Sequence, residues 1–343
     1  MPTAADVGRL AGVSPATVSR AFNSPALLDA QTLARVRNAA TRLEYRPHGL
    51  ARSLRSRRSL VMGVLIPSLT NTYFAEMVER VQALLAERGY TTLIASSHYD
   101  AEAELAAVKV MAAQRVDALL RVGRDLHSQT HPTLQRLGIP CLRAWVCDGE
   151  PPCIGFDHDA AMRELTRHLL ALGHRRFALV APFVALHDAR RSRLAAVREA
   201  LADAGVALPP APVVDHPGVG HAGGRAALLE LRERAVAATA VICSNDAIAA
   251  GVVLQAQALG LHVPRDLSVT GYNDIDLAAA FEPPLTSVAT PMAEHAAQVV
   301  EALLALADGR MPDTPAALPT RLVPRGSSGK APRARGIAPT GSR

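Results

Sequence analysis

The sequence predicts an all-α head containing a helix-turn-helix, followed by an α/β body of two doubly wound parallel-sheet lobes. Three observations support this prediction. The first 45 residues contain only helical patterns. From residue 60 onward, short apolar runs alternate with helical segments. The length of 343 residues exceeds one average domain and allows two or three.

The head is expected to contain three helices, at Thr3–Ala11, Pro15–Asn23 and Gln31–Leu43. The link Gly12-Val13-Ser14 has the length that a tight helix-turn-helix requires. Ser14 is a suitable N-cap for the second helix, and Pro15 is tolerated at its first position because that N–H needs no partner.

The body is expected to alternate strands and helices. The expected strands are Leu60–Ile66, Thr91–Ala95, Val116–Leu120, Ile139–Leu142, Phe177–Val180, Val213–Asp215, Ala240–Cys243 and Ser268–Tyr272. The expected helices are Tyr73–Arg88, Ala101–Gln114, Ala160–Leu172, Ala189–Ala204, Gly223–Arg234 and Asp246–Leu259. Ligands of such sheets bind beyond the carboxyl ends of the strands, so we expect a pocket between the lobes.

Charge is distributed unevenly along the chain. Residues 1–60 carry ten Arg against three acids, and residues 321–343 carry five Arg and one Lys without an acid. The segment between them holds 28 acids and 21 bases. A basic head on an acidic body indicates a polyanion-binding module joined to a separate sensor, whereas a generally basic surface would spread the acids more evenly.

Composition also limits the class of protein. No run of about 18 apolar residues occurs, and the N-terminus lacks the basic-then-apolar order of a secretion leader, so we expect a cytoplasmic protein. The four cysteines, which lack the spacing of a zinc site, are Cys141, Cys147, Cys153 and Cys243. We expect reduced thiols, no metal and no cofactor.

The segment DVGRLAGVSPATVSRAFN, Asp6–Asn23, resembles the head of the lactose/galactose repressor (LacI/GalR) family of bacterial transcriptional regulators. Eight further motifs continue the resemblance in order: Tyr45-Arg46-Pro47, Ala51-Arg52-Ser53-Leu54, Gly63-Val64-Leu65-Ile66-Pro67, Gly155-Phe156-Asp157, Leu172-Gly173-His174-Arg175-Arg176, Ser244-Asn245-Asp246, Gly271-Tyr272-Asn273-Asp274-Ile275 and Pro283-Pro284-Leu285-Thr286. The resemblance implies a body of the periplasmic-binding-protein type and a homodimer on palindromic double-stranded operator DNA. It further implies a repressor controlled by a small metabolite, a sugar or sugar acid, bound between the lobes.

With this resemblance, the chain divides into four segments: residues 1–45 are the head, 46–59 a hinge helix and linker, 60–326 the body and 327–343 a disordered basic tail. The N-lobe takes residues about 60–158 and 288–316, and the C-lobe about 159–287 and 317–326. Disorder is expected in the tail because Pro, Gly, Ser and Arg dominate it.

The resemblance assigns DNA contacts to the head and hinge. Pro15 and Ala16 match the family's main base-reading positions, and Arg20 matches a groove-reaching arginine. The positions that match phosphate contacts or helix caps are Thr3, Ser14, Thr17, Ser19, Asn23 and Thr32. The hinge contributes Ala51, Leu54 and Arg55, with Leu54 as the apolar wedge in the minor groove. Without the helix-turn-helix before it, the hinge would be interpreted as a solvated linker and Leu54 as an ordinary exposed leucine.

The resemblance also assigns an effector pocket. Its expected members are the aromatic pair Tyr73 and Phe74, the anchoring Arg193, and the polar residues Asn245, Asp246 and Asn273. Trp145 stands where many relatives carry an acidic residue, and its indole suits stacking on a sugar ring. Trp145 could equally pack the lobes together. Arg121, at a strand end, could face either the cleft or solvent.

Two departures from the family and two rival functions remain. Gly8 replaces a usual alanine, at a cost of about 1 kcal/mol in helix preference, and Ala196 replaces a usual glycine. A transport-type sugar-binding protein would fit the body but not the basic helical head. A nucleotide-using enzyme is not expected, because we expect neither a G-x-G-x-x-G nor a G-x-x-x-x-G-K-[ST] loop and no nucleophile–base pair stands out.

Overall fold

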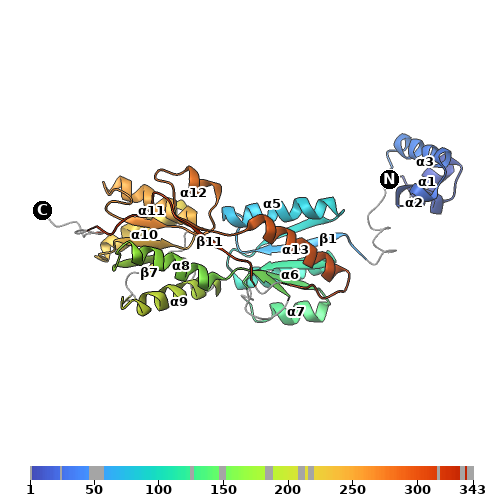
Figure 1. Cartoon of the computed structure of the whole chain (residues 1–343). Helices are drawn as coiled ribbons and strands as arrows, with labels where there is room; N and C mark the ends of the chain where they lie inside the picture. Colours follow the sequence, from blue (N-terminus) through green and yellow to red (C-terminus); the bar gives the residue numbers. More distant parts are fainter. Residues whose placement is uncertain are drawn as a thin grey trace. The chain divides into compact units, whose positions relative to one another are not determined.

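The computed structural model describes residues 2–23, 25–45, 58–123, 127–146, 152–181, 188–207, 213–214, 220–314, 317–332 and 337. The chain forms two compact units, Met1–Leu60 and Val61–Arg343 (Figure 1).

The first unit is an all-α head. Its elements are α1 (Ala4–Ala11), α2 (Pro15–Asn23), the 3-10 helix η1 (Pro25–Leu27) and α3 (Ala30–Arg42). Val7, Val18 and Val36 are fully buried and pack the three α-helices into one small core. Gly12 ends α1 at φ 65°, a left-handed conformation that glycine adopts without strain. The predicted helix-turn-helix is confirmed.

The glycine at position 8 has a packing reason. A Cβ atom there would lie 2.7 Å from the carbonyl oxygen of Val13. Val13 in turn donates its N–H to the carbonyl oxygen of Gly8 at 2.9 Å. The missing side chain lets the turn fold closely onto α1, which offsets the lower helix preference of glycine.

The N-lobe is a five-stranded parallel sheet in the order β2-β1-β3-β4-β5. Its strands are β1 (Val61–Ile66), β2 (Thr91–Ser96), β3 (Ala118–Val122), β4 (Cys141–Trp145) and β5 (Cys153–Gly155). Four helices cover it: α5 (Thr72–Glu87) and α13 (Met292–Ala307) on one face, and α6 (Ala101–Ala113) and α7 (Thr130–Leu137) on the other (Figure 1). Strands β1, β3, β4 and β5 are mostly buried, as expected of a sheet covered on both faces, whereas the edge strand β2 is half-buried.

The C-lobe repeats this arrangement with the parallel order β7-β6-β8-β9. Its strands are β6 (Phe177–Val180), β7 (Val213–Val214), β8 (Ala240–Cys243) and β9 (Ser268–Thr270). Its helices are α8 (His158–Ala171), α9 (Asp188–Asp203), α10 (His221–Glu233), α11 (Asp246–Ala258) and the short α12 (Asp276–Ala280). The antiparallel pair β10 (Ser287–Ala289) and β11 (Arg321–Val323) completes the body. Two doubly wound lobes are thus confirmed.

The C-terminal segment is folded where the structure describes it, contrary to the expected disorder. Ser327 is fully buried and exchanges backbone hydrogen bonds with Val269 and Pro284. His174 donates to the carbonyl oxygen of Gly329 at 3.0 Å. Ile337 is fully buried in the C-lobe core. Composition predicted disorder because it does not register these backbone bonds to distant strands.

The cysteines differ from expectation at one position. Cys141 and Cys243 form no disulfide, but Cys153 is disulfide-bonded, so the prediction of four reduced thiols is wrong for Cys153. Sequence spacing cannot show which thiols approach each other. Burial raises the pKa of the Cys243 thiol, which makes that group unreactive.

Helices α10 and α11 approach closely at a glycine. A Cβ atom at Gly251 would lie 2.1 Å from the carbonyl oxygen of His221. We therefore expect Gly251→Ala to lower the free energy of unfolding by about 1–3 kcal/mol, although alanine is the better helix former. Thermal unfolding measures this effect. Gly220→Ala is the control, because a Cβ there meets nothing within 4 Å. An unchanged melting temperature for Gly251→Ala would contradict the packing argument.

Candidate functional site

The second helix of the head presents a short, polar surface. Val18 and Ala21 point into the core, whereas Pro15, Ala16 and Arg20 are exposed. Small side chains allow a helix to enter the major groove, and an exposed arginine can reach base edges or phosphates. The arrangement is suited to reading DNA with the first turns of α2.

Several of the expected phosphate-contact positions also cap helices. Thr3 forms a capping box with Asp6 at the start of α1. The Ser14 hydroxyl accepts from the backbone N–H of Thr17 at 3.1 Å, which fixes the start of α2. The backbone N–H of Thr32 donates to Asp29. Thr17 and Ser19 are half-buried on α2. The side chain of Asn23 lies outside the described part, as do the hinge residues Ala51, Leu54 and Arg55.

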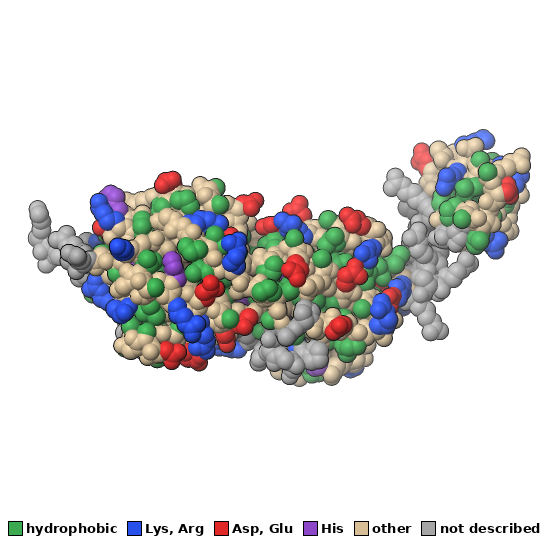
Figure 2. All heavy atoms as spheres, viewed as in Figure 1, with side chains coloured by type: hydrophobic (Ala, Val, Ile, Leu, Met, Phe, Trp, Pro, Cys, Tyr) green, Lys and Arg blue, Asp and Glu red, His purple; other side chains and the backbone are tan. Residues whose placement is uncertain are grey.

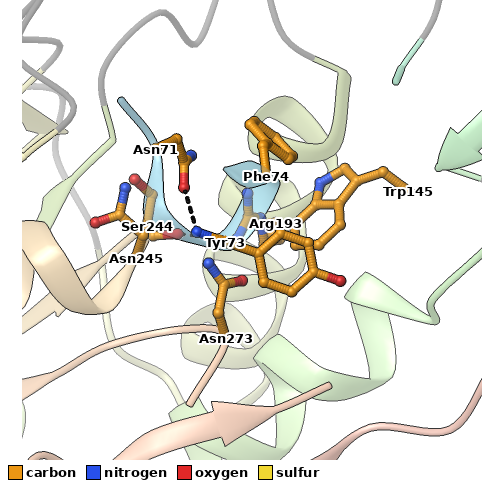
Figure 3. Close-up of a pocket in the computed structure, with 8 residues that line it drawn as sticks. All are labelled: Asn71, Tyr73, Phe74, Trp145, Arg193, Ser244, Asn245 and Asn273. Carbon is orange, nitrogen blue, oxygen red and sulfur yellow. Dashed lines mark hydrogen bonds between the residues drawn. The ribbon is translucent and has the colours of Figure 1, made fainter. Parts of the chain in front are cut away.

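The second candidate site is a small pocket between the lobes. The residues that line it are Asn71, Tyr73, Phe74, Trp145, Arg193, Ser244, Asn245 and Asn273 (Figure 3). Most of them follow the carboxyl ends of parallel strands, where doubly wound sheets bind ligands. The structure thus brings together six of the seven effector residues expected from the sequence; Asp246 is the exception.

Sequence reasoning missed two lining residues. Asn71 is the N-cap of α5 and accepts the backbone N–H of Tyr73 (Figure 3). Its signal was an asparagine directly before a helical pattern. Ser244 immediately precedes Asn245, and the end of β8 brings it to the pocket.

Four buried polar atoms of the residues that line the pocket have no hydrogen-bond partner among the described residues. They are Oη of Tyr73, Nε1 of Trp145, Oγ of Ser244 and Oδ1 of Asn273. The indole nitrogen only donates, the amide oxygen only accepts, and the two hydroxyls can do both. An unpaired buried polar group costs about 1–3 kcal/mol. Their convergence on one pocket indicates a ligand with hydroxyl or similar polar groups.

Arg193 is held in one orientation beside these atoms. Its Nη1 donates to the carbonyl oxygen of Ser244 at 3.0 Å. Its Cζ atom lies 4.4 Å from the ring centroid of Tyr272 and 6.0 Å from that of Trp145. A guanidinium stacked on an aromatic face keeps its fork of N–H groups in a fixed plane.

Trp145 both lines the pocket and packs the lobes. Its ring lies 4.4 Å from Tyr73 and 5.3 Å from Phe156, both edge-on, and only 3 % of the residue is exposed. Trp145 also has φ 80°, a left-handed backbone conformation that costs a non-glycine residue about 1 kcal/mol or more. Both roles expected of Trp145, packing against neighbouring side chains and lining the pocket, are therefore supported.

The side chain of Asp246 does not line the pocket. It accepts hydrogen bonds from the Ser287 hydroxyl at 2.5 Å and from the backbone N–H of Ile275 at 3.0 Å. Asn245, the N-cap of α11, turns to the pocket instead. The expectation of Asp246 as an effector contact is corrected to a brace between α11, β10 and the loop after β9.

Burial raises the pKa of Asp246 to about 7, despite the two hydrogen bonds that lower it. The folded state therefore holds a proton that the unfolded chain releases near pH 4, and this carboxyl makes stability fall as pH rises from about 4 to 7. We expect the free energy of unfolding of wild type, relative to Asp246→Asn, to decline over that range by up to about 4 kcal/mol. Denaturant unfolding at several pH values measures the difference. Parallel profiles would contradict the assignment.

The sequence left open whether Arg121 faces the cleft or solvent, and the structure shows a third position. It faces neither pocket nor solvent but is buried within the N-lobe, with its Nη1 3.9 Å from a carboxylate oxygen of Glu104. Glu104 also accepts from the Thr130 hydroxyl at 2.7 Å. The charged pair lies in the interior of the lobe, and neither residue lines the pocket between the lobes.

The expectation that the chain has no G-x-G-x-x-G motif is wrong. Residues Gly218 to Gly223 have the G-x-G-x-x-G spacing of dinucleotide-binding loops. The preceding strand, β7, lies at the edge of its sheet. Dinucleotides bind at the point where strand order reverses, next to central strands, so the position of β7 argues against a nucleotide site.

Three further observations concern surface charge, metal binding and membrane-spanning helices. Basic and acidic side chains are interspersed over the visible face of the body (Figure 2). Among the described residues, no group of three or more His, Cys, Asp or Glu side chains is placed to hold a metal ion. The helices that the structure describes include none long and apolar enough to cross a membrane.

Comparison with known proteins agrees with this geometry. Residues 3–48 match the family model described as bacterial regulatory proteins, lacI family, and residues 166–328 match a periplasmic binding protein-like domain. The ribose operon repressor of Escherichia coli (strain K12) is 31% identical over 313 residues, which cover 89% of this chain and 92% of that protein.

Two solved structures are also similar. One is the lac repressor dimer bound to operator and the anti-inducer ONPF, with TM-score 0.83, 28% identity and coverage of 96% of this chain and 99% of that chain. The other is the complex of the transcriptional regulator CelR with cellobiose, with TM-score 0.69, 27% identity and coverage of 96% and 100%.

Proposed function

Because the chain belongs to the lacI family of bacterial regulatory proteins and is a DNA-binding transcriptional regulator, we propose that it is a cytoplasmic repressor that binds its operator as a homodimer. The effector is a sugar or sugar acid held between the lobes. Regulators of this family are not enzymes, and the body acts here as a sensor. The two heads would read the halves of a palindrome, so that protein symmetry matches operator symmetry.

The observation that carries the effector proposal is the cluster of unpaired polar atoms beside Arg193. Asn273 and Ser244 offer partners to hydroxyl groups, and Trp145 offers a donor. Arg193 would anchor hydroxyls or a carboxylate through its fork. The relatives named for ribose and bound to cellobiose support the sugar class.

The DNA contacts proposed are those of the head and hinge. Pro15, Ala16 and Arg20 would read bases, and Leu54 would wedge into the minor groove at the operator centre. Unstacking that centre costs a few kcal/mol, so a pyrimidine–purine step is expected there.

Selection of binding sites from random DNA tests this proposal. We expect a palindrome of roughly 14 to 20 base pairs with a central C-G step. Sedimentation should give a mass of two chains and not four. An asymmetric site, or a stiff A-tract at the centre, would contradict the proposed symmetry and wedge. The selected operator then permits a screen of monosaccharides and aldonic acids for those that change its affinity.

A further inference from the structure

His158 connects the two lobes beside the effector pocket. It is the first residue of α8, and only 5 % of it is exposed. Its Nε2 lies 2.9 Å from the carbonyl oxygen of Trp145, the last residue of β4 in the N-lobe. Its Nδ1 lies 2.7 Å from the hydroxyl of Tyr272, which follows β9 in the C-lobe. One imidazole thus bridges the ends of strands from both sheets.

The protons of this bridge have one arrangement. A carbonyl oxygen only accepts, so Nε2 carries a hydrogen and donates to Trp145. Burial, with the charge of Arg193, lowers the pKa of His158 to about 3, so the ring is neutral and Nδ1 accepts. Tyr272 must then donate its hydroxyl proton. Removal of one member of the bridge would leave another buried polar group without a partner while the lobes stay closed, which favours opening.

One end of the bridge, Trp145, lines the pocket, and the other, Tyr272, supports Arg193, which also lines it. The guanidinium of Arg193 stacks on the Tyr272 ring, with its Cζ atom 4.4 Å from the ring centroid. Trp145 packs its indole 4.4 Å from Tyr73, and its left-handed backbone receives the His158 hydrogen bond. The bridge therefore ties the position of the anchoring arginine to that of the aromatic wall.

We propose that His158 and Tyr272 form an inter-lobe latch that stabilises the closed lobes and so sets the affinity of the pocket. This inference deepens the proposed function, and only its effect on the operator rests on that function. Loss of the bridge should shift the closed–open equilibrium by about 5- to 150-fold toward open, the factor expected for one unpaired buried group. The apparent affinity for effector would fall as the closed fraction falls.

The sole tryptophan reports on the latch without a ligand, because Trp145 is part of it. Acrylamide quenching of Trp145 emission measures its access to solvent. We expect weak quenching in wild type and several-fold stronger quenching in Tyr272→Phe, which removes the donor but keeps the ring under Arg193. Tyr90→Phe is the matched control: it deletes the hydroxyl of another buried tyrosine, which precedes β2 on the N-lobe sheet. Its quenching should equal that of wild type.

A second variant separates a latch from a general loss of structure. His158→Leu should raise quenching to a similar level, and the double variant with Tyr272→Phe should add little, because both remove the same bridge. Additive effects, or quenching of Tyr272→Phe equal to wild type, would overturn the latch. Circular dichroism confirms folding, and the double-mutant cycle is evaluated on variants that retain the wild-type spectrum.

Measurement of operator affinity tests separately whether the latch regulates DNA binding. If the latch controls DNA binding, Tyr272→Phe should change the affinity for the selected operator or the effector concentration that alters it, whereas Tyr90→Phe should change neither. Altered quenching with both quantities unchanged would refute the regulatory part alone. Absence of operator binding by wild type would refute the proposed function while leaving the quenching result intact.

Discussion

Replacement of Arg193 by alanine is expected to weaken effector binding by two orders of magnitude or more. The guanidinium lies beside the unpaired polar atoms of Ser244 and Asn273 and is held in plane by Tyr272. Each charge-assisted hydrogen bond is worth about 1.5–3 kcal/mol, and a fork makes two. Calorimetric titration with the effector found in the screen measures the loss.

Arg198→Ala is the matched control, because Arg198 is exposed on the same helix, α9. It should bind effector like wild type. Arg193→Lys keeps the charge but not the fork and should fall between the two. If the effector is an inducer, Arg193→Ala is a repressor that cannot be released; if it is a corepressor, the variant fails to tighten. A response of Arg193→Ala at the wild-type effector concentration would show that Arg193 does not contact the ligand.

Operator binding is expected to be strongly salt-dependent. The first 60 residues carry ten Arg against three acids, and Arg20, Arg35 and Arg37 are exposed in the head. A protein that neutralises 6–10 phosphates loses about 10³- to 10⁵-fold in affinity between 50 and 200 mM salt, with a log–log slope of about −5 to −9. Fluorescence anisotropy of labelled operator measures the slope.

Two charge-neutralising variants, one in the head and one in the body, test whether the head causes this salt dependence. Arg20→Gln should relax the sequence preference at one position of each half-site, because a base contact is lost, and should make the slope shallower by about one unit per head where Arg20 also neutralises a phosphate. Arg310→Gln, which removes an exposed arginine of the body, should leave the slope and the preference unchanged. An Arg20→Gln variant with the slope, affinity and sequence preference of wild type would remove Arg20 from the interface.

Local sequence patterns predicted the limits of helices and strands that are long or that have clear capping or turn residues at both ends. Strand β8 and helix α11 begin and end within a residue of their predicted limits, because apolar runs and caps define them. Strand β5, with three residues, is too short for a period to be visible. Ile337 is buried by contacts with distant segments of the C-lobe, which composition does not register.

The pocket was predictable to the level of its loops but not of every side chain. Asn245 and Asp246 are neighbours in sequence, yet the start of α11 turns one to the pocket and the other to Ser287. His158 carried no motif of its own. Its role follows from the meeting of Trp145 and Tyr272, which are 127 positions apart in the chain and become neighbours only in the folded body.

The most direct test of the account is an effector titration of the full-length protein on its selected operator. The account predicts that saturating effector changes operator affinity by about 5- to 150-fold, the usual range of allosteric coupling, and that Arg193→Ala shows no change at the same concentration. Identical operator affinity with and without an effector that demonstrably binds the wild-type body would contradict the claim that the pocket between the lobes controls DNA binding.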